Sequence, residues 1–116
     1  MNSQWLDQIE AGVTVCDKEG VILYMNAHSA ESFKDQGGME LVGKSLFGCH
    51  LEESNKRIRE MLKDGSPNIY TIEKNGKKKF IWQAPFTEEG VIKGLVEIHL
   101  PIPNEIPHFN RDLTKS

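Results

Sequence analysis

The adjacent residues Cys49 and His50 carry the side chains best suited to holding a cofactor. An imidazole and a thiolate are both competent axial ligands of a haem iron. The pair lies just before an apolar stripe that predicts a helix over residues 51–63, so His50 could ligate a haem in a cavity beside that helix. The alternative is that His50 caps the helix while Cys49 packs as a small hydrophobic residue. Both interpretations stay open, because one His–Cys pair has no further ligand at a recognisable spacing.

Glu97 and His99 are a second pair of polar side chains that could meet a ligand. They alternate with Leu95 along a predicted strand, so all three side chains point to the same face of a sheet. If this face is the inner one, the carboxylate and the imidazole would orient a ligand in a pocket. The alternative is a face that is partly exposed near the sheet edge, and a one-residue bulge would exchange the two assignments.

Large hydrophobic side chains occur at helix and strand spacing and could line the same pocket. They are Phe33, Phe47, Ile58, Tyr70 and Trp82. Together with Cys49, His50, Glu97 and His99 they form the predicted set of ligand-contacting residues. The alternative is that most of them are ordinary core, because residues of this size at these spacings commonly pack against one another.

No arrangement of residues typical of an enzyme is found in the sequence. Catalysis would require a nucleophile with a base, paired carboxylates or a metal constellation. Ser45, Ser54 and Cys49 have no recognisable relay partner. The acidic residues fall in predicted turns and helix starts, where they improve solubility or complement helix dipoles. We therefore expect a protein that binds rather than catalyses, with no metal site apart from a haem ligated by His50.

The length and charge of the chain limit its partners. Its 116 residues fit one domain. A net charge of −3 disfavours binding to phosphate backbones, and no apolar run approaches the roughly 20 residues that span a bilayer. The start of the chain lacks the features of a secretory signal, and the two cysteines have no CxxC spacing. We expect a cytoplasmic protein with reduced thiols and neither a nucleic-acid nor a membrane partner.

The first half of the chain predicts a hairpin between helices. Trp5, Leu6 and Ile9 recur at helical spacing and predict a short amphipathic helix that ends before Gly12. Residues 13–16 and 21–25 are β-rich runs joined by a turn at Gly20. Asn26 stands where an N-cap should, before a helix predicted to run from residue 27 to about 33.

The second half predicts one longer helix and three strands. Short helical turns are expected over 39–48, followed by the helix over 51–63 and strands over 69–73, 78–86 and 91–100. Asn75-Gly76 is a strong hairpin signal between the first two of these strands. The last two strands carry large apolar residues on both faces, which predicts a sheet covered on both sides. The tail from Pro101 contains further prolines and is expected to be extended or disordered.

The order of these elements and three short segments resemble the PAS family. The segment G-V-I-L-Y-M-N at 20–26 resembles its strand-to-helix junction, E-L-V-G-K at 40–44 resembles a further family segment, and Gly94 resembles the start of its last hairpin. Residues 42–50 running into Lys63-Asp64-Gly65 are similar to bacterial PAS modules found beside hemerythrin-like domains. The resemblance implies an α+β fold, with a five-stranded antiparallel sheet, helices packed on one face and an N-terminal covering helix. The expected boundaries are 1–10 for this helix, 11–102 for the PAS domain and 103–116 for a proline-containing tail.

The resemblance also implies a function in sensing. PAS domains bind a small ligand or cofactor between sheet and helices and signal through a homodimer or a partner protein, so Trp5, Leu6 and Ile9 are expected at a dimer interface. The cofactor itself is not identified by the residues, with haem and other small molecules both open. Residues 43–50 lack the cysteine motif of photosensing members, so covalent flavin photochemistry is not expected. The alternative function is a ligand-free dimerisation module whose interior is filled by side chains.

Overall fold

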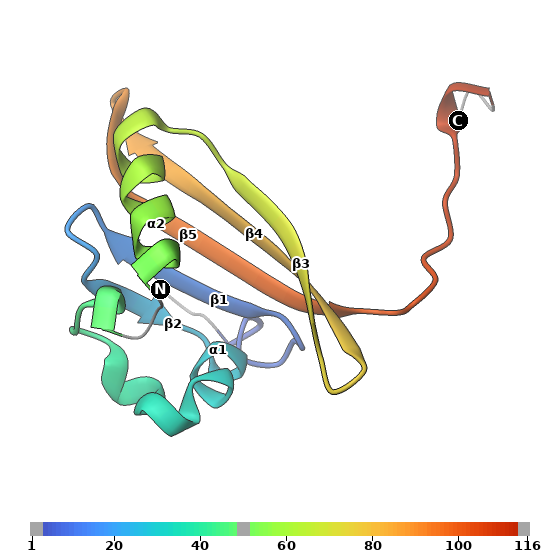
Figure 1. Cartoon of the computed structure of the whole chain (residues 1–116), viewed down its shortest axis with the longest axis horizontal. Helices are drawn as coiled ribbons and strands as arrows, with labels where there is room; N and C mark the ends of the chain where they lie inside the picture. The colour runs from blue at the N-terminus through green and yellow to red at the C-terminus, as the bar shows by residue number, and fades with distance from the viewer. Residues whose placement is uncertain (1–3, 49–51, 114–116) are drawn as a thin grey trace.

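The fold is a five-stranded antiparallel sheet, with helices between the second and third strands in the sequence (Figure 1). The computed structural model describes residues 4–48 and 52–113. The strands are β1 (Gly12–Asp17), β2 (Ile22–Met25), β3 (Asn68–Lys74), β4 (Lys77–Glu88) and β5 (Val91–Ile102). The helices are α1 (Ala27–Ser32) and α2 (Glu52–Asp64), with short 3₁₀ helices at Lys34–Gln36, Gly38–Leu41, Leu46–Gly48 and Arg111–Leu113. The strand order is β2-β1-β5-β4-β3, which confirms the predicted sheet.

Local turn chemistry explains two of the three hairpins. The Asp17 carboxylate accepts hydrogen bonds from the backbone amides of Glu19 (3.0 Å) and Val21 (2.9 Å), which closes the β1–β2 turn. Asn75 and Gly76 have φ values of 54° and 75°, the pair of left-handed residues that a type I′ turn requires. The predicted hairpin at this position is confirmed.

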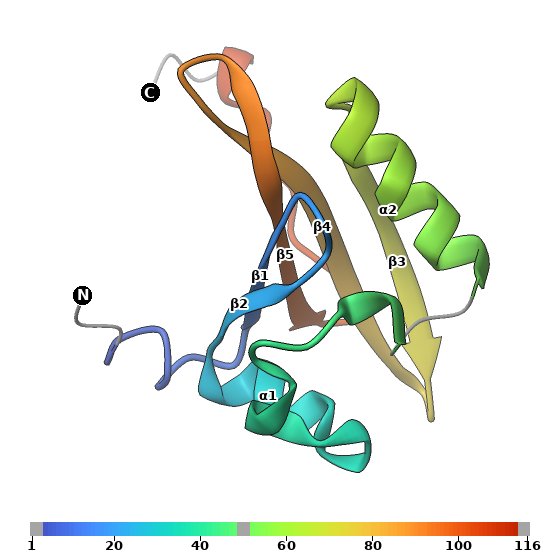
Figure 2. The ribbon, with the colours of Figure 1, turned by 90° about the vertical axis from the view of Figure 1, so that its left-hand side faces the viewer.

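The helices cover one face of the sheet, which we call the inner face (Figure 2). The core lies between them, and its buried members include Cys16, Ile22, Met25, Leu41, Leu46, Ile58, Met61 and Leu95. Ile58 and Met61 are the buried side of α2, as its apolar stripe predicts. The sheet therefore gains its main hydrophobic stabilisation from this side.

The side chain of Asn26 links four segments of the chain. It is fully buried, and its Oδ1 accepts hydrogen bonds from the backbone amides of Ser29 (3.0 Å) and Val13 (2.9 Å). Its Nδ2 donates to the carbonyl oxygens of Leu6 (2.7 Å) and Ala11 (2.8 Å). The predicted N-cap of α1 is confirmed, and the same amide also holds the residues before β1 in place.

The helix predicted before β1 is wrong. Residues 4–10 form turns and bends, with a backbone hydrogen bond from the Gln8 amide to the Trp5 carbonyl (3.1 Å). A helix this short has an unfavourable nucleus, and the Asn26 amide binds the Leu6 carbonyl, which a helix would use internally. Trp5 is 71% exposed and does not cover the sheet.

The second face of the sheet is apolar and partly exposed. We call it the outer face, and its apolar residues on β5, β4 and β3 are Val96, Ile98, Leu100, Phe80, Trp82 and Ile69. Trp82 is 44% exposed and Ile69 is 48% exposed. The sequence pattern was right about two apolar faces, but the predicted second cover is absent among residues 4–48 and 52–113. Within that part of the chain, no helix is long and apolar enough to cross a membrane.

Candidate functional site

A small cavity of about 30 Å³ lies between the inner face and the helices. Its lining is almost entirely apolar and consists of Thr14, Cys16, Ile22, Met25, Phe33, Leu41, Leu46, Ile58, Leu95 and Glu97. A space of this size holds roughly one or two water molecules. Sites for drug-sized ligands are on the order of 300–1,000 Å³, so a large cofactor would require the helical layer to move.

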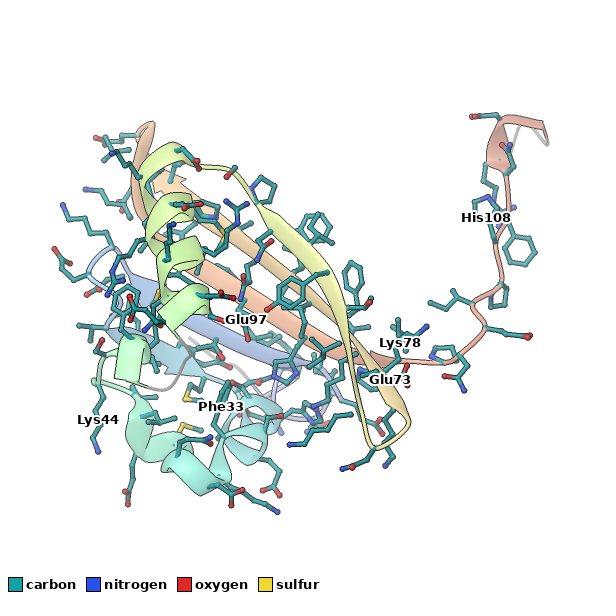
Figure 3. The ribbon with its side chains drawn as sticks, in the orientation of Figure 1. Phe33, Lys44, Glu73, Lys78, Glu97 and His108 are labelled. Atoms are coloured by element: carbon teal, nitrogen blue, oxygen red, sulfur yellow. The ribbon has the colours of Figure 1, made fainter. Side chains whose placement is uncertain are left out.

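A row of polar residues crosses the inner face next to this cavity. Thr14, Glu97, Gln83 and Asn68 are paired in register across β1, β5, β4 and β3. The buried Gln83 donates from Nε2 to Glu97 Oε2 (2.7 Å) and accepts at Oε1 from Asn68 Nδ2 (3.0 Å). The Thr14 and Ser29 hydroxyl groups are hydrogen-bonded, which joins the row to α1. Figure 3 shows Glu97 on the sheet close to α2.

A second, open pocket of about 300 Å³ lies at the other end of this row. It is lined by Glu53, Ser54, Arg57, Asn68, Tyr70 and Gln83. Burial raises the pKa of Tyr70, and the nearby Glu97 charge raises it further, against a smaller lowering by the Gln83 hydrogen bond. Because Gln83 lines this pocket and Glu97 lines the cavity, their hydrogen bond connects the walls of the two spaces, and we call this pair the partition.

His99 follows Glu97 on the same face of β5, where it pairs with Gly12 of β1. It is 4% exposed. Its ring covers Gly12, where an added Cβ would come within 2.0 Å of Nε2. Burial, with smaller contributions from the charges of Lys79 and His28, lowers the pKa of His99 to about 4. The imidazole is therefore neutral at pH 7, and its Nε2 has no hydrogen-bond partner in the part of the chain that the structure describes.

The structure gathers only part of the predicted set around the cavity. Phe33, Ile58 and Glu97 line it, and Tyr70 lines the neighbouring pocket. Phe47 packs at the edge of the core, and His99 covers Gly12. Cys49 and His50 lie outside the residues that the structure describes.

The prediction that Trp82 lines the pocket is wrong, because Trp82 lies on the outer face. It pairs with Ile98 and Ile69, whereas the neighbouring Gln83 points inward. Sequence reasoning also missed Thr14, whose alternation with Cys16 was visible in the sequence. It missed Gln83 because its partner Glu97 becomes adjacent only through strand pairing.

The described part of the cavity does not fit a haem. Its volume is far below that of a cofactor site. Cys16 is the thiol in its wall, and burial raises the pKa of this thiol to about 11, so it is not a thiolate at neutral pH. Among residues 4–48 and 52–113, no three His, Cys, Asp or Glu side chains cluster as a metal site would require.

An antiparallel sheet of this strand order, with one helix-covered face and a cavity beneath the helices, defines an α+β domain that encloses a small interior site. A family model described as the PAS fold matches residues 6–64, just over half of the chain. The chain belongs to the PAS fold family, as its sequence segments predict. No curated protein matches the chain.

Solved structures share this fold at low sequence identity. A sensory box histidine kinase from Vibrio cholerae is 19% identical with a TM-score of 0.65, and the match covers 87% of this chain and 89% of that one. The Aer2 receptor of Vibrio cholerae, described as a dual PAS–haem oxygen sensor, is 18% identical with a TM-score of 0.62, covering 80% and 95%. VqmA bound to DPO is 14% identical with a TM-score of 0.64, covering 84% of this chain and 55% of VqmA.

Proposed function

We propose that this PAS domain is a sensory module that acts by binding, without catalysis. A small organic molecule with an apolar body and one hydrogen-bond donor or positive charge would occupy the cavity beneath the helices. The change in the helical layer would then reach a second copy or a partner protein. The observation that carries this proposal is that Glu97 lies in the wall of a cavity whose other lining residues, apart from Thr14, are apolar.

An ionised carboxylate does not stabilise an apolar cavity wall by packing. Moving an ionised group toward apolar surroundings costs free energy unless hydrogen bonds or a counter-charge compensate. Glu97 receives one hydrogen bond from Gln83, and the three ion pairs found among the described residues do not include it. A ligand that donates to Glu97 would supply the missing compensation, while the surrounding side chains would contact its apolar part.

The partition between the two spaces provides a route of entry. A ligand in the open pocket meets Gln83 first, and displacement of its side chain would join that pocket to the cavity. The cavity must then expand, and α1 is hydrogen-bonded to its wall through Ser29 and Thr14. For the ligand to shift the domain between two arrangements, it must bind them unequally. An expanding cavity meets this condition, because the closed form has no room for the ligand.

The outer side of the domain is the surface on which we expect signalling contacts. Residues 4–11 lie on the side of the sheet away from α2 (Figure 2). Trp5 and Ile9 are exposed there, and the outer face adds Trp82. VqmA of Vibrio cholerae, which shares the fold, is described as a dimer. We therefore propose a homodimer through this side, with Leu6 as a further contact.

The first experiment is mass spectrometry of the purified protein under native and denaturing conditions, with an absorbance spectrum of the same sample. A released organic molecule supports the sensory proposal. A Soret band would instead establish a haem protein and contradict the argument from cavity size. If the protein is colourless and releases nothing, the ligand-free dimerisation module becomes the better account, because the small cavity is already close to filled.

Glu97→Gln separates the ligand-binding role of the carboxylate from a structural one. The amide oxygen of Gln can still accept the bond from Gln83, so the free energy of unfolding should change by less than about 1 kcal/mol. A donor held by the carboxylate should bind about 10- to 100-fold more weakly, since hydrogen bonds to charged groups contribute about 1.5–3 kcal/mol. The measurement is the amount of co-purified molecule released per protein. Glu88→Gln, at an exposed hairpin end, is the control, and equal occupancy in both variants would contradict the proposal.

A further inference from the structure

We propose that the tail segment over residues 103–112 of one copy packs across the outer face of a second copy, so that two chains exchange these segments. We call this segment the arm. The inference rests on the outer-side dimer of the proposed function and names the part of the partner that covers the outer face. It starts from two uncovered apolar features of the same chain, the arm and the outer face.

The arm exposes large apolar side chains along its length. All residues from 103 to 112 are exposed, with Ile106 at 58% and Phe109 at 70%. Figure 1 shows the arm leading away from the body after β5, and Figure 3 shows His108 far from the sheet. Single exposed apolar residues are common on protein surfaces, but two on one projecting segment, in a chain that also has a partly uncovered apolar sheet face, indicate an interaction surface.

The prolines of this segment favour packing on a face over pairing at a sheet edge. Pro103 and Pro107 each fix the backbone φ angle at an extended value and lack the amide donor that a strand ladder would need. A segment pre-ordered in this way loses less conformational entropy when it binds. The arm is therefore suited to binding through side chains, with Ile106 and Phe109 as its anchors.

The spacing of the anchors matches the spacing of the outer face. In an extended proline-type conformation, a rise of about 3.1 Å per residue places Ile106 and Phe109 about 9 Å apart. Ile98, Trp82 and Ile69 are paired in register on β5, β4 and β3. Strands lie about 4.8 Å apart, so Ile98 and Ile69 are separated by roughly the same distance. An arm that crosses the strands can place its two anchors on either side of Trp82.

A second copy is the occupant that the geometry favours. The arm follows Ile102, the last residue of β5, which pairs with Lys78 at the end of the sheet. To reach its own outer face the chain would have to reverse there, but Pro101 and Pro103 hold it extended on both sides of Ile102. Each chain carries one arm and one outer face, so a two-fold arrangement covers both and closes without further copies.

The test is the oligomeric state of the full chain, measured by sedimentation velocity over a range of concentrations. We expect a dimer, and we expect both Ile106→Ser/Phe109→Ser and Trp82→Ser to weaken dimerisation at least 100-fold. Met39→Ser is the matched control, because Met39 is similarly exposed but lies on the helical side. All of these side chains are exposed, so circular dichroism and thermal unfolding should show folded proteins.

Mixing the two weakened variants gives a sharper result. The Trp82→Ser chain keeps an intact arm, and the Ile106→Ser/Phe109→Ser chain keeps an intact outer face. Their heterodimer therefore retains one complete arm–face contact, and the mixture should associate more strongly than either variant alone.

Three outcomes would overturn the arm exchange. A dimer that survives the arm substitutions but not Trp82→Ser would show that the outer face binds something else, and the proposed outer-side dimer would stand. A mixture that associates no better than its components would also exclude exchange. A monomeric wild type would refute both the exchange and the dimer, while the ligand released in mass spectrometry would still decide the sensory proposal.

Discussion

Asn26→Ala is expected to lower the free energy of unfolding by about 3–5 kcal/mol. The substitution removes four hydrogen bonds and leaves the backbone amides of Val13 and Ser29 without their acceptor. It also leaves the carbonyls of Leu6 and Ala11 without their donor. Each buried polar group left unsatisfied costs about 1–3 kcal/mol. Denaturant unfolding followed by circular dichroism measures the loss, and the Tm should fall by more than about 10 °C.

Two further variants serve as a comparison and a control for Asn26→Ala. Asn26→Asp keeps an oxygen for the amides of Val13 and Ser29 but places a second oxygen against the two carbonyls, so it should be nearly as destabilising. Asn110→Ala removes an exposed side chain that accepts a hydrogen bond from the nearby Asp112 amide (2.9 Å), and it should leave stability unchanged. A loss below about 1 kcal/mol in Asn26→Ala would show that the four segments hold together without this side chain.

The stability of the domain should fall as the pH is lowered from about 6.5 to about 4, because of His99. In the folded protein its pKa is lowered to about 4, against an ordinary value of 6.5. Above pH 6.5 both folded and unfolded chains carry a neutral imidazole, so the stability is fully present. As the pH falls further, the unfolded chain binds a proton that the folded chain does not, and stability is lost until about pH 4. The difference amounts to up to about 3 kcal/mol.

His99→Leu isolates this contribution. Leucine is similar in size, does not titrate and removes the buried Nε2 that has no described partner. The slope of unfolding free energy against pH should therefore be flatter in the variant between pH 6.5 and 4. His108→Leu, on the exposed arm, is the control and should keep the wild-type slope. Equal slopes in all three proteins would mean that His99 titrates normally.

Features that depend on neighbouring residues could be predicted from the sequence. Asn26 as an N-cap and Asn75-Gly76 as a hairpin turn follow from the conformations that these residue types favour, and both are confirmed. The prediction of a helix over Trp5 to Ile9 is wrong for a non-local reason. The Asn26 side-chain amide binds the Leu6 carbonyl, which would otherwise accept a hydrogen bond within the helix. Propensity is a weak prior wherever a tertiary hydrogen bond opposes it.

The site was harder to predict than the fold. Alternation placed Glu97 and His99 on one face, as observed, but it could not show which face of β4 is inner, so Trp82 was assigned to the pocket. The polar row exists only because β1 pairs with β5, which lies far from it in the sequence, and because the β4–β5 hairpin then sets Gln83 opposite Glu97. The size of the cavity depends on how closely side chains from seven segments pack together, which no pattern of residue types reports.

The reactivity of the Cys16 thiol in the cavity wall would report whether the cavity is open or closed. Its thiol is buried, and its raised pKa of about 11 keeps it protonated, so it is inert toward oxidants and alkylating reagents while the domain is closed. Expansion of the helical layer would admit water and reagent together. In a Cys49→Ser background, the rate of alkylation of Cys16 would therefore count opening events directly. The alkylation rate of Cys16 would thus measure the motion of the helical layer on which sensing would depend.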